Sequence, residues 1–274
     1  MTCDLKSTFF ISMSDSQYYL LAGSYDFNIH AFGLTDFQEY MSFKTGGLQA
    51  NRIIVCGDRF YVAVFGYILL YDITLQKVEP FHKCFFQERS NTSDIAITPT
   101  LLLGCGEDKT IRYWDRRNSK QNFMIKTEDT LNAIISLDKY QIIIVGDEDG
   151  RVSMYDIKTS TCVYSVVNNN SPVRSISLSP DETSFLACHM DGETLKYSFD
   201  NGGHSFSLVY KIRAHDNLQL RVVHSPDNTM FATTAGDNSA KIWSNDKGEL
   251  ICTFKPDSKL EWIWDAVFTP DSKR

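Results

Sequence analysis

The chain has 274 residues, a formal net charge of −7, and 43% hydrophobic, 13% aromatic and 22% charged residues. This composition is typical of a globular protein with a substantial core, and the acidic balance argues against a general nucleic-acid binder. The longest apolar stretch, around Tyr61 to Tyr71, is shorter than the roughly 20 residues that a membrane-spanning helix needs. The start of the chain lacks the charged-then-apolar pattern of a signal peptide.

Cysteine usage indicates a reducing compartment, the cytosol or nucleus. The count is odd, and no two cysteines have CxxC spacing: Cys3, Cys56, Cys84, Cys105, Cys162, Cys188 and Cys252. Several lie in apolar runs, where a free cysteine behaves as a small hydrophobic residue. We therefore expect neither a disulfide framework nor a zinc site.

An aromatic residue preceded by an aspartate six positions earlier recurs along the chain. The pairs, in chain order, are Asp26/Phe32, Asp108/Trp114, Asp149/Tyr155, Asp191/Tyr197 and Asp237/Trp243. Tyr71 fills the gap after the first pair, with Phe65 where the aspartate is expected. The six aromatic residues are separated by 39, 43, 41, 42 and 46 residues. A period of about 40 to 45 with this pattern is typical of WD40 propellers.

Reverse turns and alternating strands fall in the same register. Turn sequences such as Ser179-Pro180-Asp181 and Ser225-Pro226-Asp227 precede apolar runs, a tight turn and an alternating strand. We predict an all-β fold, a WD40 β-propeller of the seven-bladed type in one domain, 1–274. The predicted blades cover approximately 8–44, 45–85, 86–126, 127–167, 168–212, 213–254 and, incomplete at the C-terminal end, 255–274.

The seventh predicted blade consists of one strand and one turn, Trp262 to Asp271. About 30 to 40 residues of a usual blade are missing after it. An unpaired strand edge is therefore expected to be exposed.

The periodic aspartates are predicted to be structural, since they can accept hydrogen bonds from backbone amides in the tight turns. The structural blade residues are Asp26, Asp108, Trp114, Asp149, Asp191, His215, Thr233, Asp237 and Trp243. In the sixth repeat, His215 can bridge Asp237 and Thr233, whose hydroxyl reaches the indole of Trp243. This group resembles the structural tetrad of WD40 repeats and is not a catalytic triad, although its residue types are similar.

A candidate partner-binding surface follows from counting back six and eight residues from each reverse turn, to positions near the narrow top face of a propeller. Side chains two apart on a strand point the same way. The counts give Gln49, Asn51, Asn91, Ser93, Thr130, Asn132, Arg174, Leu220, Trp262 and Trp264. We predict partner binding by Trp262, Trp264, Gln49, Asn51, Asn132 and Arg174, since aromatic anchors among small polar residues suit protein recognition. The alternatives are packing of the tryptophans between blades and simple solvent exposure of the polar residues.

An enzyme is not predicted, and no cofactor or metal is expected. The six histidines, His30, His82, His189, His204, His215 and His224, show no metal-ligand spacing. No GxSxG motif or glycine-rich phosphate loop occurs. The acidic residues are repeat-periodic, which points to structure.

The order of the motifs resembles that of the small G-protein-beta-like WD40 subunit shared by both target-of-rapamycin kinase complexes. The distinguishing features are the second repeat without its aspartate (65–72), the full tetrad in the sixth repeat, and the Trp262-Ile263-Trp264 start of the seventh. Departures are the missing end and Tyr197-Ser198 at the Trp-Asp position of the fifth repeat. The resemblance covers nearly the whole chain.

The resemblance implies a non-catalytic scaffold that binds the C-terminal lobe of the target-of-rapamycin kinase domain and stabilises it, with kinase contact through Trp262 and Trp264. We expect a cytoplasmic protein that associates with endomembranes only through the complex. The net charge argues against a nucleic-acid partner, and the chain shows no lipid-binding patch or lipidation motif that would favour direct membrane insertion. The alternatives are a ubiquitin-ligase substrate adaptor and a G-protein-beta-type signalling subunit. Those classes carry an extra amino-terminal domain or helix, whereas the first blade here is expected to begin by about Phe9.

Overall fold

The computed structural model describes residues 5–14, 17–75, 77–85, 90–117, 121–200, 202–256 and 262–273. These residues form strands β1 to β24 and one short 3-10 helix, η1 (Ile73–Leu75). The chain divides into two compact units, Met1–Thr130 (unit 1) and Leu131–Arg274 (unit 2). The described part contains no helix with the length and apolarity needed to span a membrane.

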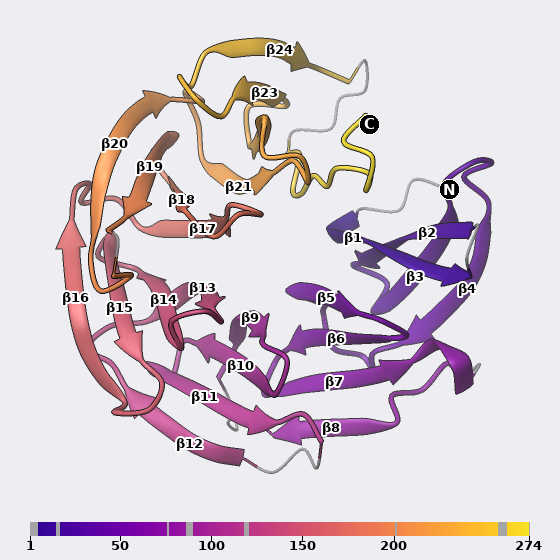
Figure 1. The fold of residues 1–274 in the computed structure, drawn as a ribbon. Coiled ribbons are helices and arrows are strands. Elements are labelled where there is room, and N and C mark those ends of the chain that lie inside the picture. The colour runs from indigo at the N-terminus through magenta and orange to yellow at the C-terminus, as the bar shows by residue number, and fades with distance from the viewer. Residues whose placement is uncertain are drawn as a thin grey trace. The chain divides into compact units, whose positions relative to one another are not determined.

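Unit 1 contains three four-stranded antiparallel sheets, each with its strands in chain order (Figure 1). The first is β1 (Leu5–Ser14), β2 (Gln17–Ser24), β3 (Asn28–Gly33) and β4 (Glu39–Lys44). The second is β5 (Arg52–Cys56), β6 (Arg59–Val64), β7 (Tyr67–Asp72) and β8 (His82–Phe85). The third is β9 (Thr92–Ile97), β10 (Leu101–Gly106), β11 (Thr110–Asp115) and β12 (Gln121–Lys126).

Unit 2 repeats this arrangement in three further sheets. These are β13 (Leu131–Leu137), β14 (Ile142–Asp147), β15 (Arg151–Asp156) and β16 (Thr161–Val167); then β17 (Val173–Leu178), β18 (Ser184–His189), β19 (Glu193–Phe199) and β20 (Phe206–Arg213). The last sheet is β21 (Gln219–His224), β22 (Met230–Ala235), β23 (Ala240–Ser244) and β24 (Leu250–Phe254).

Neighbouring sheets within each unit bury their faces against each other. In unit 1, Phe43 of the first sheet contacts Phe60 and Tyr71 of the second, with ring centroids 4.9 and 5.7 Å apart. In unit 2, Tyr164 of the β13–β16 sheet contacts Phe206 of the next sheet at 4.9 Å. Because a single four-stranded sheet cannot bury both of its faces, this stacking of successive sheets provides the core.

The turn between the second and third strands of a sheet approaches the segment that leads into the next sheet. Gly192, after β18, has a φ of +94°, and a Cβ there would lie 2.1 Å from the carbonyl oxygen of His215. The amides of Ala214 and His215 donate to the carbonyl of Gly192. Only glycine permits this backbone conformation and approach, so the turn links adjacent sheets.

The all-β propeller architecture is confirmed, but the prediction of seven blades is wrong, because the described residues form six four-stranded sheets. Residues 262–269, predicted to begin a seventh blade, contain no strand, although a turn does follow at Thr269–Ser272. The first strand of a blade receives its ladder of backbone hydrogen bonds from the second strand of the same blade. No described strand pairs with 262–269, so the segment lacks that ladder.

Candidate functional site

The turn aspartates of the first and third sheets bind their own turns. Asp26 accepts a hydrogen bond from the Asn28 amide at 3.0 Å and from Nε2 of His30 at 3.0 Å. The other ring nitrogen of His30 lies 2.8 Å from Glu39. Burial would lower the pKa of His30, but the hydrogen bonds to Glu39 and Asp26 raise it above its ordinary value. Glu39 could not be predicted as a partner of His30, because it lies on the neighbouring strand β4.

The third sheet has an arginine where the first has a histidine, four residues after the turn aspartate. Asp108 accepts from the Thr110 amide and hydroxyl, and Nη2 of Arg112 donates to it at 2.9 Å. Trp114 is buried in the apolar cluster between the second and third sheets. The predicted blade residues Asp108 and Trp114 thus have structural partners.

In the fourth sheet the turn carboxylate belongs to a different residue from the one predicted. Oδ1 of Asp147 accepts from the amides of Asp149 and Arg151, at 3.1 and 2.8 Å, while Asp149 is exposed. In the fifth sheet, Asp191 accepts from Nδ2 of Asn169 at 3.0 Å. The spacing rule pointed to Asp149 because two acids lie two residues apart, and only the end of β14 places Asp147 under the turn amides.

The sixth sheet contains a complete hydrogen-bonded tetrad. Nε1 of Trp243 donates to Oγ1 of Thr233 at 2.9 Å, and that hydroxyl lies 2.8 Å from Nε2 of His215. Nδ1 of His215 lies 2.9 Å from Asp237. Burial lowers the pKa of His215, so the imidazole is neutral at pH 7, with its proton on Nδ1 facing Asp237. Every hydrogen in this chain of bonds has an acceptor, and the Thr233 hydroxyl is fully buried, so the group is built to hold the sheet together.

The predicted partner-binding positions coincide with a repeated backbone irregularity. In four sheets, the register between the first and second strands shifts by one residue at the predicted rim position. The extra residues are Ser93, Asn132, Arg174 and Leu220. A bulge of this kind breaks the strict alternation of a strand and re-aims a side chain. Sequence periodicity could not reveal it, because a bulge leaves no composition pattern.

In unit 1 the amide side chains of the rim positions bind one another. Nδ2 of Asn51 donates to Oδ1 of Asn91 at 2.6 Å and to the carbonyl of Thr92 at 3.1 Å. Nε2 of Gln49 is buried without a hydrogen-bond partner in the described part of the chain. Thr130 is partly exposed. Asn51 and Asn91 therefore join the second and third sheets of this unit.

In unit 2 the rim positions have different environments. Nδ2 of Asn132 donates to Glu148 at 2.7 Å, which ties β13 to the turn after β14. Arg174 is partly exposed, whereas Leu220 is buried.

The two tryptophans lie beside the end of β22, which pairs with the start of β21. Their ring centroids are 5.0 Å apart, and Trp262 has 37% of its surface exposed. The amide of Ile263, between them, donates to the carbonyl of Ala235 at 3.1 Å. A Cβ on Gly236 would lie 3.4 Å from the Trp262 indole. The pair thus forms a partly exposed aromatic surface on unit 2.

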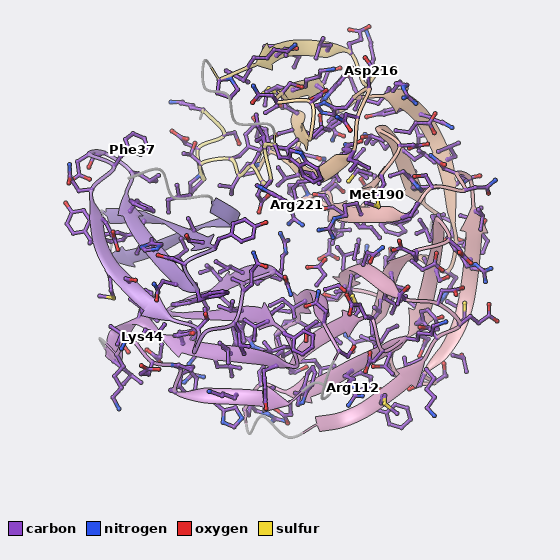
Figure 2. All side chains as sticks on the ribbon, turned by 180° about the vertical axis from the view of Figure 1, so that it is seen from behind. Phe37, Lys44, Arg112, Met190, Asp216 and Arg221 are labelled. Carbon is purple, nitrogen blue, oxygen red and sulfur yellow. The ribbon has the colours of Figure 1, made fainter. Side chains whose placement is uncertain are left out.

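A charged pair joins this segment to the last sheet. Nε of Arg221, on β21 (Figure 2), lies 3.2 Å from Oδ1 of Asp265, and Nη1 donates to Oγ of Ser175 at 3.2 Å. The second and third sheets of unit 1 have the same pair, with Nε of Arg52 3.1 Å from Oδ1 of Asp94. Asp94 directly follows the rim residue Ser93, as Asp265 follows Trp264. Residues 262–268 therefore occupy the place of a first strand next to β21, without the strand conformation.

The described residues contain no group of three or more His, Cys, Asp or Glu side chains placed to hold a metal ion. The polar groups found here bind turns and neighbouring sheets, and the aromatic pair and the rim amides suit contacts with another protein.

Comparison with known proteins supports this interpretation. The family model "WD domain, G-beta repeat" matches residues 160–194 and 206–244. These are WD40 repeats. The matched segments span most of the fifth sheet, and parts of the fourth and sixth.

The chain is also similar to curated proteins of one kind. The mouse "Target of rapamycin complex subunit LST8" is 25% identical over 79% of this chain and 71% of its own length. The Drosophila melanogaster "Protein LST8 homolog" is 26% identical over 80% of this chain and 72% of its own. An Arabidopsis thaliana protein named "Non-functional target of rapamycin complex subunit LST8-2" is 23% identical over 94% of this chain and 85% of its own. The resemblance predicted from the motif order is thus confirmed.

Proposed function

We propose that this chain is a non-catalytic scaffold subunit of a target-of-rapamycin kinase complex, where it binds and stabilises the kinase domain. The observation that carries the proposal is the similarity, at 24 to 25% identity, to mouse and yeast proteins named as subunits of the target of rapamycin complex. The WD40 repeats and the closed tetrad in the sixth sheet support a role in binding. A scaffold of a ubiquitin ligase or a G-protein pathway is not favoured by these relatives.

The kinase contact is proposed to lie on the C-terminal lobe of the kinase domain and to include Trp262 and Trp264. Trp262 is more than one third exposed, and its ring lies in tilted contact with the indole of Trp264. Exposed tryptophans of this kind are frequent anchors of protein interfaces. Gln49, Asn51, Asn132 and Arg174 are proposed as further contacts, on the parts of the rim that belong to each unit. The complex would give the protein its cytoplasmic location and any peripheral association with endomembranes.

Affinity capture of the tagged chain from its own cells, with partners identified by mass spectrometry, tests the proposal. The wild type is compared with Trp262→Ala/Trp264→Ala and with Phe123→Ala, a control that removes an exposed aromatic side chain of β12 in unit 1. We expect one very large kinase with the wild type and the control, and a loss of about tenfold or more with the double variant, since anchor residues dominate interfaces.

Recovery of ligase or G-protein components without such a kinase would overturn the proposal. Recovery of no partner by a folded wild type would also overturn it, and would group the chain with the Arabidopsis relative whose name calls it non-functional.

A further inference from the structure

The segment that carries the two tryptophans is attached to unit 2 without a strand ladder. The first strands of all six described sheets pair with a second strand, whereas residues 262–269 have no strand conformation. Near its ends, the segment has the hydrogen bond from the Ile263 amide to Ala235, and one from the Asp227 amide to Oγ of Ser272 at 3.1 Å. Between these ends lies the ion pair of Arg221 and Asp265.

We infer that Arg221 is a positioning residue that holds the Trp262–Trp264 pair in place through its buried ion pair with Asp265. The side chains are 13% and 5% exposed, so the pair is shielded from solvent and from salt. Asp265 is the residue directly after Trp264, so a displacement of the backbone at Asp265 also displaces Trp264. Because Trp262 and Trp264 are the proposed contact with the kinase, the role of Arg221 deepens the proposed function and rests on it.

The geometry of Arg221 favours a fixed position. Nη1 donates to Oγ of Ser175 on β17, while Nε lies 3.2 Å from Oδ1 of Asp265 in an ion-pair contact without hydrogen-bond geometry, so one guanidinium joins two sheets and the segment. The planar guanidinium of an arginine can contact Ser175 and Asp265 with different nitrogens at once, which the single ammonium of a lysine cannot. Removing either charge would break the buried ion pair and leave the remaining charge poorly compensated, since the Ala266 amide that donates to Oδ1 of Asp265 at 2.8 Å carries no charge. Release of the segment into water is then the least costly response.

Unit 1 provides a matched comparison. Arg52 and Asp94 form the same pair at 3.1 Å, with side chains 15% and 6% exposed. There the aspartate is on β9, which also pairs with β10 along its length. Loss of the Arg52 charge should therefore destabilise unit 1 without releasing a segment, and it should leave the tryptophans unchanged.

The test measures amide hydrogen exchange of residues 262–268 and acrylamide quenching of tryptophan fluorescence in the full chain. Trp114 and Trp243 are buried, so quenching reports mainly on Trp262 and Trp264. We expect Arg221→Gln and Asp265→Asn each to speed exchange by about tenfold or more and to raise quenching, because the clamp is lost. Asp265→Asn changes the segment rather than β21, and so keeps the test valid if Arg221→Gln impairs folding of the sheet.

The exchanged pair Arg221→Asp/Asp265→Arg should restore slow exchange, and Arg52→Gln should leave it at the wild-type rate. Unchanged protection in both single variants would overturn the inference, whatever their kinase binding. If protection is lost as expected but the wild type captures no kinase, the clamp stands and the proposed function fails.

Discussion

Replacing Thr233 by valine tests the tetrad most sharply, because a matched control lies next to it. Thr233 and Thr234 are both fully buried on β22. The Thr233 hydroxyl bonds both Trp243 and His215, whereas Oγ1 of Thr234 has no hydrogen-bond partner in the described part of the chain. Valine keeps the volume of threonine and removes only the hydroxyl, so the two variants differ in lost hydrogen bonds alone.

The expected magnitudes follow from that difference. Thr233→Val leaves the indole N–H and Nε2 of His215 buried without partners, and each such group costs about 1 to 2 kcal/mol, or about 2 to 4 kcal/mol in total. Thr234→Val removes an unpartnered hydroxyl, so its stability should change by about 0 or rise by up to about 1 kcal/mol.

Urea unfolding followed by tryptophan fluorescence measures both, with the m-value compared between variants to confirm that the same surface is exposed. The reasoning is refuted if Thr233→Val lies within about 0.5 kcal/mol of the wild type, or if the two variants cost the same.

Three other predictions concern the same unit. Burial lowers the pKa of His224 to about 4 from an ordinary 6.5, so the unfolded chain binds a proton more readily, and stability falls as the pH drops from 6.5. That loss is about 2 kcal/mol at pH 5, and His224→Gln should flatten the pH dependence of the urea midpoint; an unchanged slope would contradict this. Gly192→Ala should lower the unfolding free energy by about 3 kcal/mol or more, because this residue has a positive φ and a Cβ there would contact a neighbouring carbonyl. Gly47→Ala should cost only about 1 kcal/mol, because Gly47 has a positive φ but open space around it. Equal costs in thermal melts would count against the turn contact. Phe185→Ala should lower the unfolding free energy by about 3 to 5 kcal/mol, because the ring is fully buried; a cost below about 1 kcal/mol would show that the core collapses around it.

The repeat could be predicted from the sequence because the turn aspartate and the aromatic residue six positions later recur at nearly the same place in each blade. The tetrad could be predicted down to its four residues, because His215, Thr233, Asp237 and Trp243 stand at the spacing that the repeat requires. The six sheets follow from the period, as the backbone hydrogen bonds of one blade must close within one repeat.

What could not be predicted depends on backbone geometry or on distant partners. Asp147 and Asp149 have the same chemistry, and only the position at which β14 ends decides which one binds the turn. The bulges at the rim positions leave no pattern in the sequence. The prediction of a strand from Trp262 onward was wrong. An apolar, aromatic pattern shows that a segment can form a strand, but it does not show that a second strand is present to pair with it.

The ion pairs show the same limit. Arg221 and Asp265 are 44 residues apart in the sequence, and Arg52 and Asp94 are 42 apart. Their separation is close to the length of one repeat, which is the signal that could have suggested them: a charge on one first strand and the opposite charge on the next.

The most direct test of the proposed function is the affinity of the purified chain for the purified kinase domain of the target-of-rapamycin kinase from the same organism, measured by surface plasmon resonance. The account predicts saturable binding that Trp262→Ala/Trp264→Ala weakens by about a hundredfold, with Phe123→Ala unchanged, because two anchor indoles are lost. Absence of binding by the folded wild type, or equal binding by the double variant, would contradict it.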